Sequence, residues 1–78
     1  MTRNSFYTAL EDILGVSHGS LNESDSRETI ANWSSIADVK ILTIIASEFG
    51  IEPDPALMEA ETIADLTKVL EARRAFSL

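Results

Sequence analysis

Two adjacent serines, Ser34 and Ser35, stand directly before a long apolar run and are the residues best placed for covalent chemistry. The run extends to Phe49 and predicts a helix that begins at Ser35 or Ile36. The first N–H groups of a helix lack intrahelical partners, and the helix dipole favours an anion at this end. A serine hydroxyl held there is therefore suited to carry a phosphate ester.

Other functions for these polar residues have less support. A simple N-cap is the ordinary role of a serine at a helix start, and it is the main alternative for Ser35. A Ser-His-Asp hydrolase would combine Ser35, His18 and Asp25, but nothing in the chain supplies an oxyanion loop or a pocket. The acidic segment 22–28 lacks the central glycine and the final glutamate of a calcium loop. His18 has no cysteine or second histidine nearby, so we expect a solvated side chain and no metal site.

Length and composition favour one small domain over residues 1–78 that is not an enzyme. A chain of 78 residues with 45% hydrophobic content can build one core, with little room for a substrate pocket and catalytic groups. The 13 acidic and 6 basic residues give a net charge of −7, which opposes binding to nucleic acids and to anionic membranes. Basic protein surfaces are the natural partners of such a chain.

The absence of cysteine and the hydropathy of the chain indicate its cellular location. There is no cysteine, so any thiol chemistry must come from an attached group. No apolar run approaches membrane-spanning length, and the N-terminus lacks the apolar region of a signal peptide. We therefore expect a cytoplasmic protein.

The first half of the chain predicts a helix and a long loop. Asn4 or Ser5 is the expected N-cap of the helix and Gly15 its end. The predicted buried face comprises Phe6, Ala9, Leu10, Ile13 and Leu14, and the predicted polar face comprises Thr8, Glu11 and Asp12. The loop from Val16 to about Ser34 has no period, but its spaced apolar residues, Val16, Leu21, Ile30 and Trp33, indicate attachment to the core.

The second helix is expected to end at Gly50 and to start with a capping box of Ser35 and Asp38. Its predicted buried face comprises Val39, Leu42, Ile45, Ala46 and Phe49, and its opposite face comprises Ile36, Lys40, Thr43, Ile44 and Ser47. A solvated face would not normally include two isoleucines. We therefore predict that Ile36, Lys40 and Ile44 bind a partner.

The last third of the chain predicts two further helices and no strand. A short helix opens at Pro55 and runs through Ala60, with Leu57 and Met58 expected in the core. Thr62 and Asp65 mark the start of a final helix that ends near Arg73-Arg74. The predicted fold is all-α, a small antiparallel four-helix bundle with a long first loop and a short third helix.

This order of elements resembles the acyl carrier protein family, whose attachment motif reads Asp-Ser-Leu at a helix start and here reads Ser34-Ser35-Ile36. The resemblance covers nearly the whole chain. It implies that Ser35 is esterified by 4′-phosphopantetheine, which a separate phosphopantetheinyl transferase takes from coenzyme A. The thiol of this arm would carry acyl groups as thioesters to acyl-loading and acyl-processing enzymes. The protein itself would be a monomer that catalyses nothing.

Two departures from the family pattern indicate a specialised pathway. Ser34 replaces the motif aspartate, which removes a charge that the transferase is expected to read. Lys40, Ala46 and Ser47 occupy positions where carriers of fatty-acid synthesis commonly bear acids. We therefore expect a polyketide, nonribosomal peptide or other specialised acyl-transfer pathway, with partner contacts that depend on apolar burial. The alternative is a carrier-fold interaction module without a prosthetic group.

Overall fold

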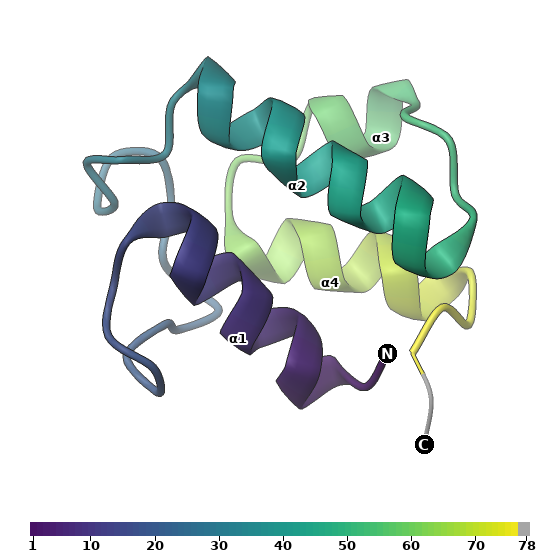
Figure 1. The fold of residues 1–78 in the computed structure, drawn as a ribbon. Coiled ribbons are helices and arrows are strands. Elements are labelled where there is room, and N and C mark those ends of the chain that lie inside the picture. The colour runs from purple at the N-terminus through teal and green to yellow at the C-terminus, as the bar shows by residue number, and fades with distance from the viewer. Residues whose placement is uncertain (77–78) are drawn as a thin grey trace.

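The structure is a computed structural model that describes residues 1–76. This part of the chain contains four helices. They are α1 (Arg3–Leu14), α2 (Ser35–Phe49), α3 (Pro55–Met58) and α4 (Ile63–Ala72), as Figure 1 shows. Helix α1 packs on α2, and α3 packs on α4. Residues 1–76 contain no strand, and an isolated antiparallel bridge joins Ser26 and Thr62. The prediction of an all-helical protein is confirmed.

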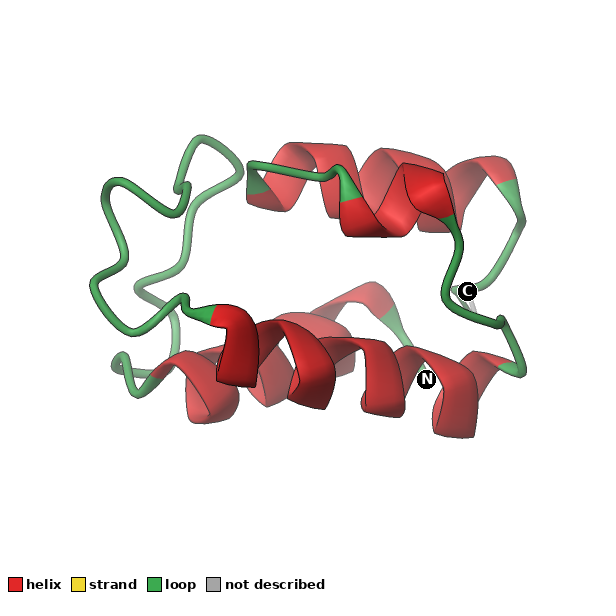
Figure 2. Ribbon diagram, turned by 90° about the horizontal axis from the view of Figure 1, so that it is seen from above, coloured by secondary structure: helices red, strands yellow, loops and turns green. Residues whose placement is uncertain are grey.

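None of the helices within residues 1–76 combines the length and the apolarity that crossing a bilayer requires. The connection between α1 and α2 is the longest of the described chain, and in Figures 1 and 2 it extends from one end of these helices. Leu21, Ile30 and Trp33 are buried within it, so the loop is attached to the core as predicted.

Helix α1 begins two or three residues earlier than the sequence predicts. The hydroxyl of Thr2 accepts a 3.1 Å hydrogen bond from the amide of Ser5, which makes Thr2 the N-cap in place of Asn4 or Ser5. Gly15 ends the helix with φ +70°, as expected of a left-handed C-cap.

Glu11 lies in the core and not on the predicted polar face of α1. Its side chain turns to the long loop, where Oε2 accepts hydrogen bonds from the amides of Gly19 at 2.7 Å and Leu21 at 3.0 Å. The carboxylate thereby satisfies two backbone donors of the loop, one of them at the buried Leu21. Its burial follows from the loop's return across the end of α1.

Helix α2 starts at Ser35, and Ser34 is its N-cap in an extended conformation with no hydrogen bond from its side chain to the helix. The predicted capping box of Ser35 and Asp38 is wrong, because Ser35 is already inside the helix and the carboxylate of Asp38 is bound elsewhere. Gly50 ends α2 with φ +67°, as predicted.

The buried stripe of α2 differs from the predicted one. Ala37, Ile41 and Ile45 face the core at the four-residue spacing of a helix. Val39 is 63% exposed and Ala46 is also exposed, so their predicted burial is wrong. Apolar residues occur on every side of this helix, and its sequence alone does not select one face.

Helices α3 and α4 follow their predicted boundaries closely. Asp54 caps α3 by accepting a 3.1 Å hydrogen bond from the amide of Leu57, and α3 ends at Met58, two residues earlier than expected. Leu57 is buried, but Met58 is 62% exposed, which corrects its predicted place in the core. The capping box of Thr62 and Asp65 at the start of α4 is present as predicted.

Candidate functional site

Ser35 is the first residue of α2 and is exposed to solvent. The first intrahelical hydrogen bond of α2 runs from the amide of Asp38 to the carbonyl of Ser34 at 3.0 Å. The amides of residues 35–37 therefore lie at the open end of the helix, where its dipole favours an anion. The geometry provides an accessible hydroxyl next to free backbone donors.

The residues of a possible hydrolytic triad do not support such a site. His18 lies within 2.6 Å of Asp12, measured from Nε2 to Oδ1, and this carboxylate raises the pKa of the exposed imidazole. Asp25 accepts hydrogen bonds within its own loop, from the amide of Asn22 and the hydroxyl of Thr29. Each group is engaged locally, and within residues 1–76 neither forms a hydrogen bond with Ser35. Within residues 1–76 no group of three or more acidic or histidine side chains could hold a metal ion.

Arg27 and Trp33 of the long loop form a polar cluster with Asp38, which lies three residues beyond Ser35 in the first turn of α2. Nη1 of Arg27 donates to Oδ2 of Asp38 at 2.7 Å, and Nε1 of Trp33 donates to Oδ1 at 2.8 Å. The guanidinium carbon lies 4.9 Å from the centroid of the Trp33 ring, a cation–π distance. Nη2 of Arg27 also donates to the carbonyl of Ala60 at 3.2 Å, so the cluster connects the long loop, α2 and the segment before α4.

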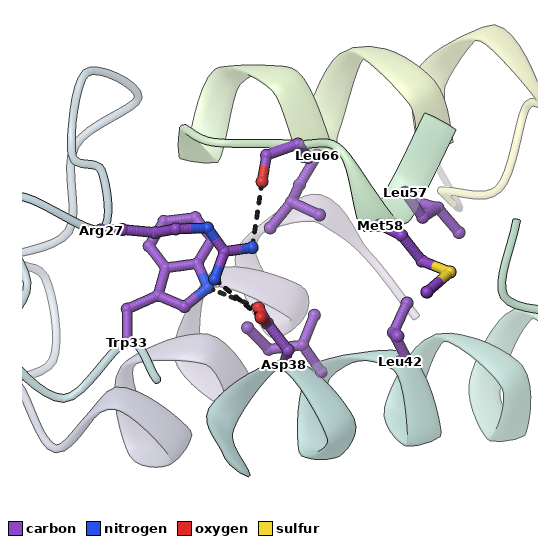
Figure 3. A pocket seen from close by; sticks show the side chains of 9 residues that line it. Arg27, Trp33, Asp38, Leu42, Leu57, Met58 and Leu66 are labelled. Atoms are coloured by element: carbon purple, nitrogen blue, oxygen red, sulfur yellow. Dashed lines mark hydrogen bonds and ion pairs between the residues drawn. The ribbon is translucent and has the colours of Figure 1, made fainter. Parts of the chain in front are cut away.

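This polar cluster forms one wall of a cavity between α2, α3 and α4 (Figure 3). The cavity has a volume of about 90 Å³. In the close-up, Arg27 and Trp33 lie on one side of it, and Leu42 from α2 and Leu57 and Met58 from α3 lie on the other. The apolar part is formed by Ile41, Leu42, Leu57, Met58, Ala60 and Leu66. Its chemistry suits a small ligand with both polar and apolar parts.

Sequence reasoning did not identify Arg27. It lies in a loop without periodicity, eleven residues before Asp38, and spacing gave no signal for their pairing. The stacking partner Trp33 was expected to anchor the loop on the helices, and its 5% exposure confirms this.

The three predicted partner-binding residues have unequal exposure. Ile36 is 69% exposed and Lys40 is exposed, whereas Ile44 is half-buried. Val39, predicted to be buried, adds its side chain to the exposed surface of α2. The apolar surface near Ser35 is thus formed by Ile36 and Val39, with Met58 exposed on α3.

Comparison of the chain with models of protein families, with curated proteins and with solved structures found no match. The basis for a function lies in the geometry of Ser35, of the polar cluster and of the cavity.

Proposed function

We propose that this protein is a carrier that holds acyl intermediates on a 4′-phosphopantetheine arm esterified to Ser35. The observation that carries the proposal is the exposure of Ser35 as the first residue of α2. An accessible hydroxyl at the open end of a 15-residue helix suits the attachment of an anionic phosphodiester.

The residues around Ser35 fit the phosphodiester of such an arm. The amides at the start of α2 can donate to its oxygens, and the nearest carboxylate of the helix, Asp38, is paired with Arg27. When bound, the arm supplies the thiol that a chain without cysteine lacks. The role of the protein is then to present the arm on a fixed helix end and to raise its effective concentration at partner enzymes.

The arrangement proposed for the helices is the small antiparallel four-helix bundle of carrier proteins. The packing of α1 on α2 and of α3 on α4 is consistent with it. We also propose the corresponding partners, a phosphopantetheinyl transferase and the acyl-loading and acyl-processing enzymes of a polyketide, nonribosomal peptide or other specialised pathway. Ile36 and Lys40, both exposed on α2, are the proposed contacts, and Ile44 contributes through its exposed part.

A second candidate function is a carrier-fold interaction module without a prosthetic group. Ser34 favours this alternative, because a neutral residue stands where the carrier motif has an acid. The exposed side chains of Ile36 and Val39 would serve such a module equally well.

Intact mass separates the two functions. The purified protein is incubated with coenzyme A and a broad-specificity phosphopantetheinyl transferase, and the modified residue is located by peptide mapping. A carrier gains one arm at Ser35, Ser35→Ala abolishes the gain, and Ser34→Ala serves as the matched control that keeps it. No mass gain with any transferase favours the interaction module.

A further inference from the structure

The polar wall of the cavity is rich in hydrogen-bond donors. A guanidinium carries five N–H donors, and residues 1–76 supply acceptors for Arg27 through Asp38 and the carbonyl of Ala60. Each carboxylate oxygen of Asp38 already accepts one hydrogen bond, and the single N–H of Trp33 is used. Among the donors of the wall, those of Arg27 are the ones that remain for a ligand within residues 1–76.

The charge of this wall selects among oxygen-bearing ligands. The cation of Arg27 is offset by the carboxylate of Asp38 at 2.7 Å, so no net positive charge remains for a second anion. A ligand carboxylate beside Arg27 would also lie close to the carboxylate of Asp38 and be repelled by it. A neutral oxygen, such as that of a ketone, accepts from Arg27 without this penalty.

The size of the cavity limits the ligand to a short chain. A cavity of about 150 Å³ in another protein holds one benzene, so on the same measure 90 Å³ holds roughly four non-hydrogen atoms. Leu42, Leu57 and Met58 provide an apolar surface opposite the polar cluster (Figure 3). Met58 is 62% exposed and borders the cavity from the short helix α3.

We propose that the cavity shelters a short acyl group with a neutral oxygen close to the thioester, such as a 3-oxoacyl group of about four carbons, whose oxygen accepts from Arg27. This inference rests on the proposed function. It names the class of acyl group that the carrier prefers to bury, and it makes Arg27 the residue that determines this preference.

The test compares three acyl groups on the same protein. A transferase loads the protein from coenzyme A esters of butanoyl, 3-oxobutanoyl and octanoyl groups, and intact mass verifies each product. The 3-oxobutanoyl form should have a higher Tm than the butanoyl form by roughly 4–8 °C, the shift expected from one net hydrogen bond in a domain of this size. The chain has one tryptophan, so the NMR signal of the Trp33 indole N–H should also shift most in the 3-oxobutanoyl form.

Variants assign the preference to Arg27. Arg27→Leu keeps an apolar side chain against Trp33 but removes the donors, and it should abolish the Tm difference between the two four-carbon forms. Arg3→Leu is the matched control, because Arg3 pairs with Glu23 and Glu71 outside the cavity. This variant should keep the difference. Each Tm is compared with that of the same variant carrying the unacylated arm.

The possible outcomes distinguish this inference from the proposed function. Equal Tm values for the two four-carbon forms of the wild type, a larger stabilisation by octanoyl, or an undiminished difference in Arg27→Leu would overturn the preference and leave the carrier function intact. The wild-type comparison holds even if Arg27→Leu does not fold. Failure to load any acyl group would overturn both.

Discussion

The indole N–H of Trp33 donates a 2.8 Å hydrogen bond to the carboxylate of Asp38, and this bond joins the end of the long loop to the first turns of α2. Trp33→Phe keeps an aromatic ring in the core and removes the donor. We expect a loss of about 1 kcal/mol in the free energy of unfolding, the net value of a typical hydrogen bond. Urea unfolding followed by circular dichroism measures it.

Tyr7→Phe is the control for this substitution. The hydroxyl of Tyr7 is buried and has no hydrogen-bond partner within residues 1–76, so its removal should leave stability unchanged or raise it. Equal losses in Trp33→Phe and Tyr7→Phe would contradict the stabilising role of the Trp33–Asp38 bond.

Ser34→Asp tests the departure from the carrier motif. The substitution restores the acid expected by the transferase, and Ser34 is an N-cap whose side chain makes no hydrogen bond to α2. A charge-assisted contact is worth on the order of 1.5 kcal/mol, so modification of Ser35 should become about tenfold faster. The rate is measured by mass spectrometry with limiting transferase.

Ser34→Asn has nearly the same shape as Ser34→Asp without its charge. The transferase should modify Ser35 of this variant at the wild-type rate. The variant should share with Ser34→Asp any gain in stability from a new N-cap, since asparagine and aspartate cap helices about equally well. A similar acceleration in both variants would assign the effect to helix capping and not to recognition of the charge.

The ends of α1 and α2 and the start of α4 were predictable because their signals are local. Gly15 and Gly50 adopt the left-handed conformation that the end of a helix requires, and Thr62 reaches its capping partner Asp65 three residues away. Such features involve residues within one or two turns of each other. The exposed position of Ser35 follows in the same way from the boundary of α2.

Features that depend on the path of the loop were not predictable. Glu11 is buried because the amides of Gly19 and Leu21 return to it, and no helical pattern encodes that return. The pairing of Arg27 with Asp38 also joins a loop without periodicity to a helix. The polar wall of the cavity was missed for this reason, although Trp33 itself was correctly expected to pack on the helices.

The two isoleucines of the predicted partner surface should now respond differently to truncation. Ile36 is 69% exposed, so Ile36→Ala should leave Tm unchanged and slow acyl transfer to the cognate enzyme by roughly fivefold or more, the effect of losing over about 1 kcal/mol at an interface. Ile44 is half-buried, and Ile44→Ala should lower Tm as well as the transfer rate.

Thermal unfolding and transfer kinetics on the same samples check this difference, with Thr8→Ala on the exposed side of α1 as a control. If apolar burial drives recognition, added salt should change the transfer rate little. A steep loss of transfer with salt, together with wild-type transfer rates in both isoleucine variants, would show that partners are bound by charge.

The ion pair between Asp54 and Arg73 should make the stability of the protein dependent on pH. The hydrogen bond from Arg73, and then that from the amide of Leu57, hold the pKa of Asp54 below its ordinary value of 3.8. Because the pKa of Asp54 is lower in the folded state, the stabilisation is fully present above the pKa of the unfolded state. It is lost as the pH falls through the pKa of the folded state.

Asp54→Asn retains a capping side chain and removes the charge. Its Tm should therefore lie below that of the wild type at pH 7, and the gap should close below pH 3.8. Glu59→Gln removes one negative charge at the other end of α3 and should leave Tm at pH 7 unchanged. A gap of constant size from pH 7 to pH 3 would mean that Asp54 stabilises α3 through its shape and not through its charge.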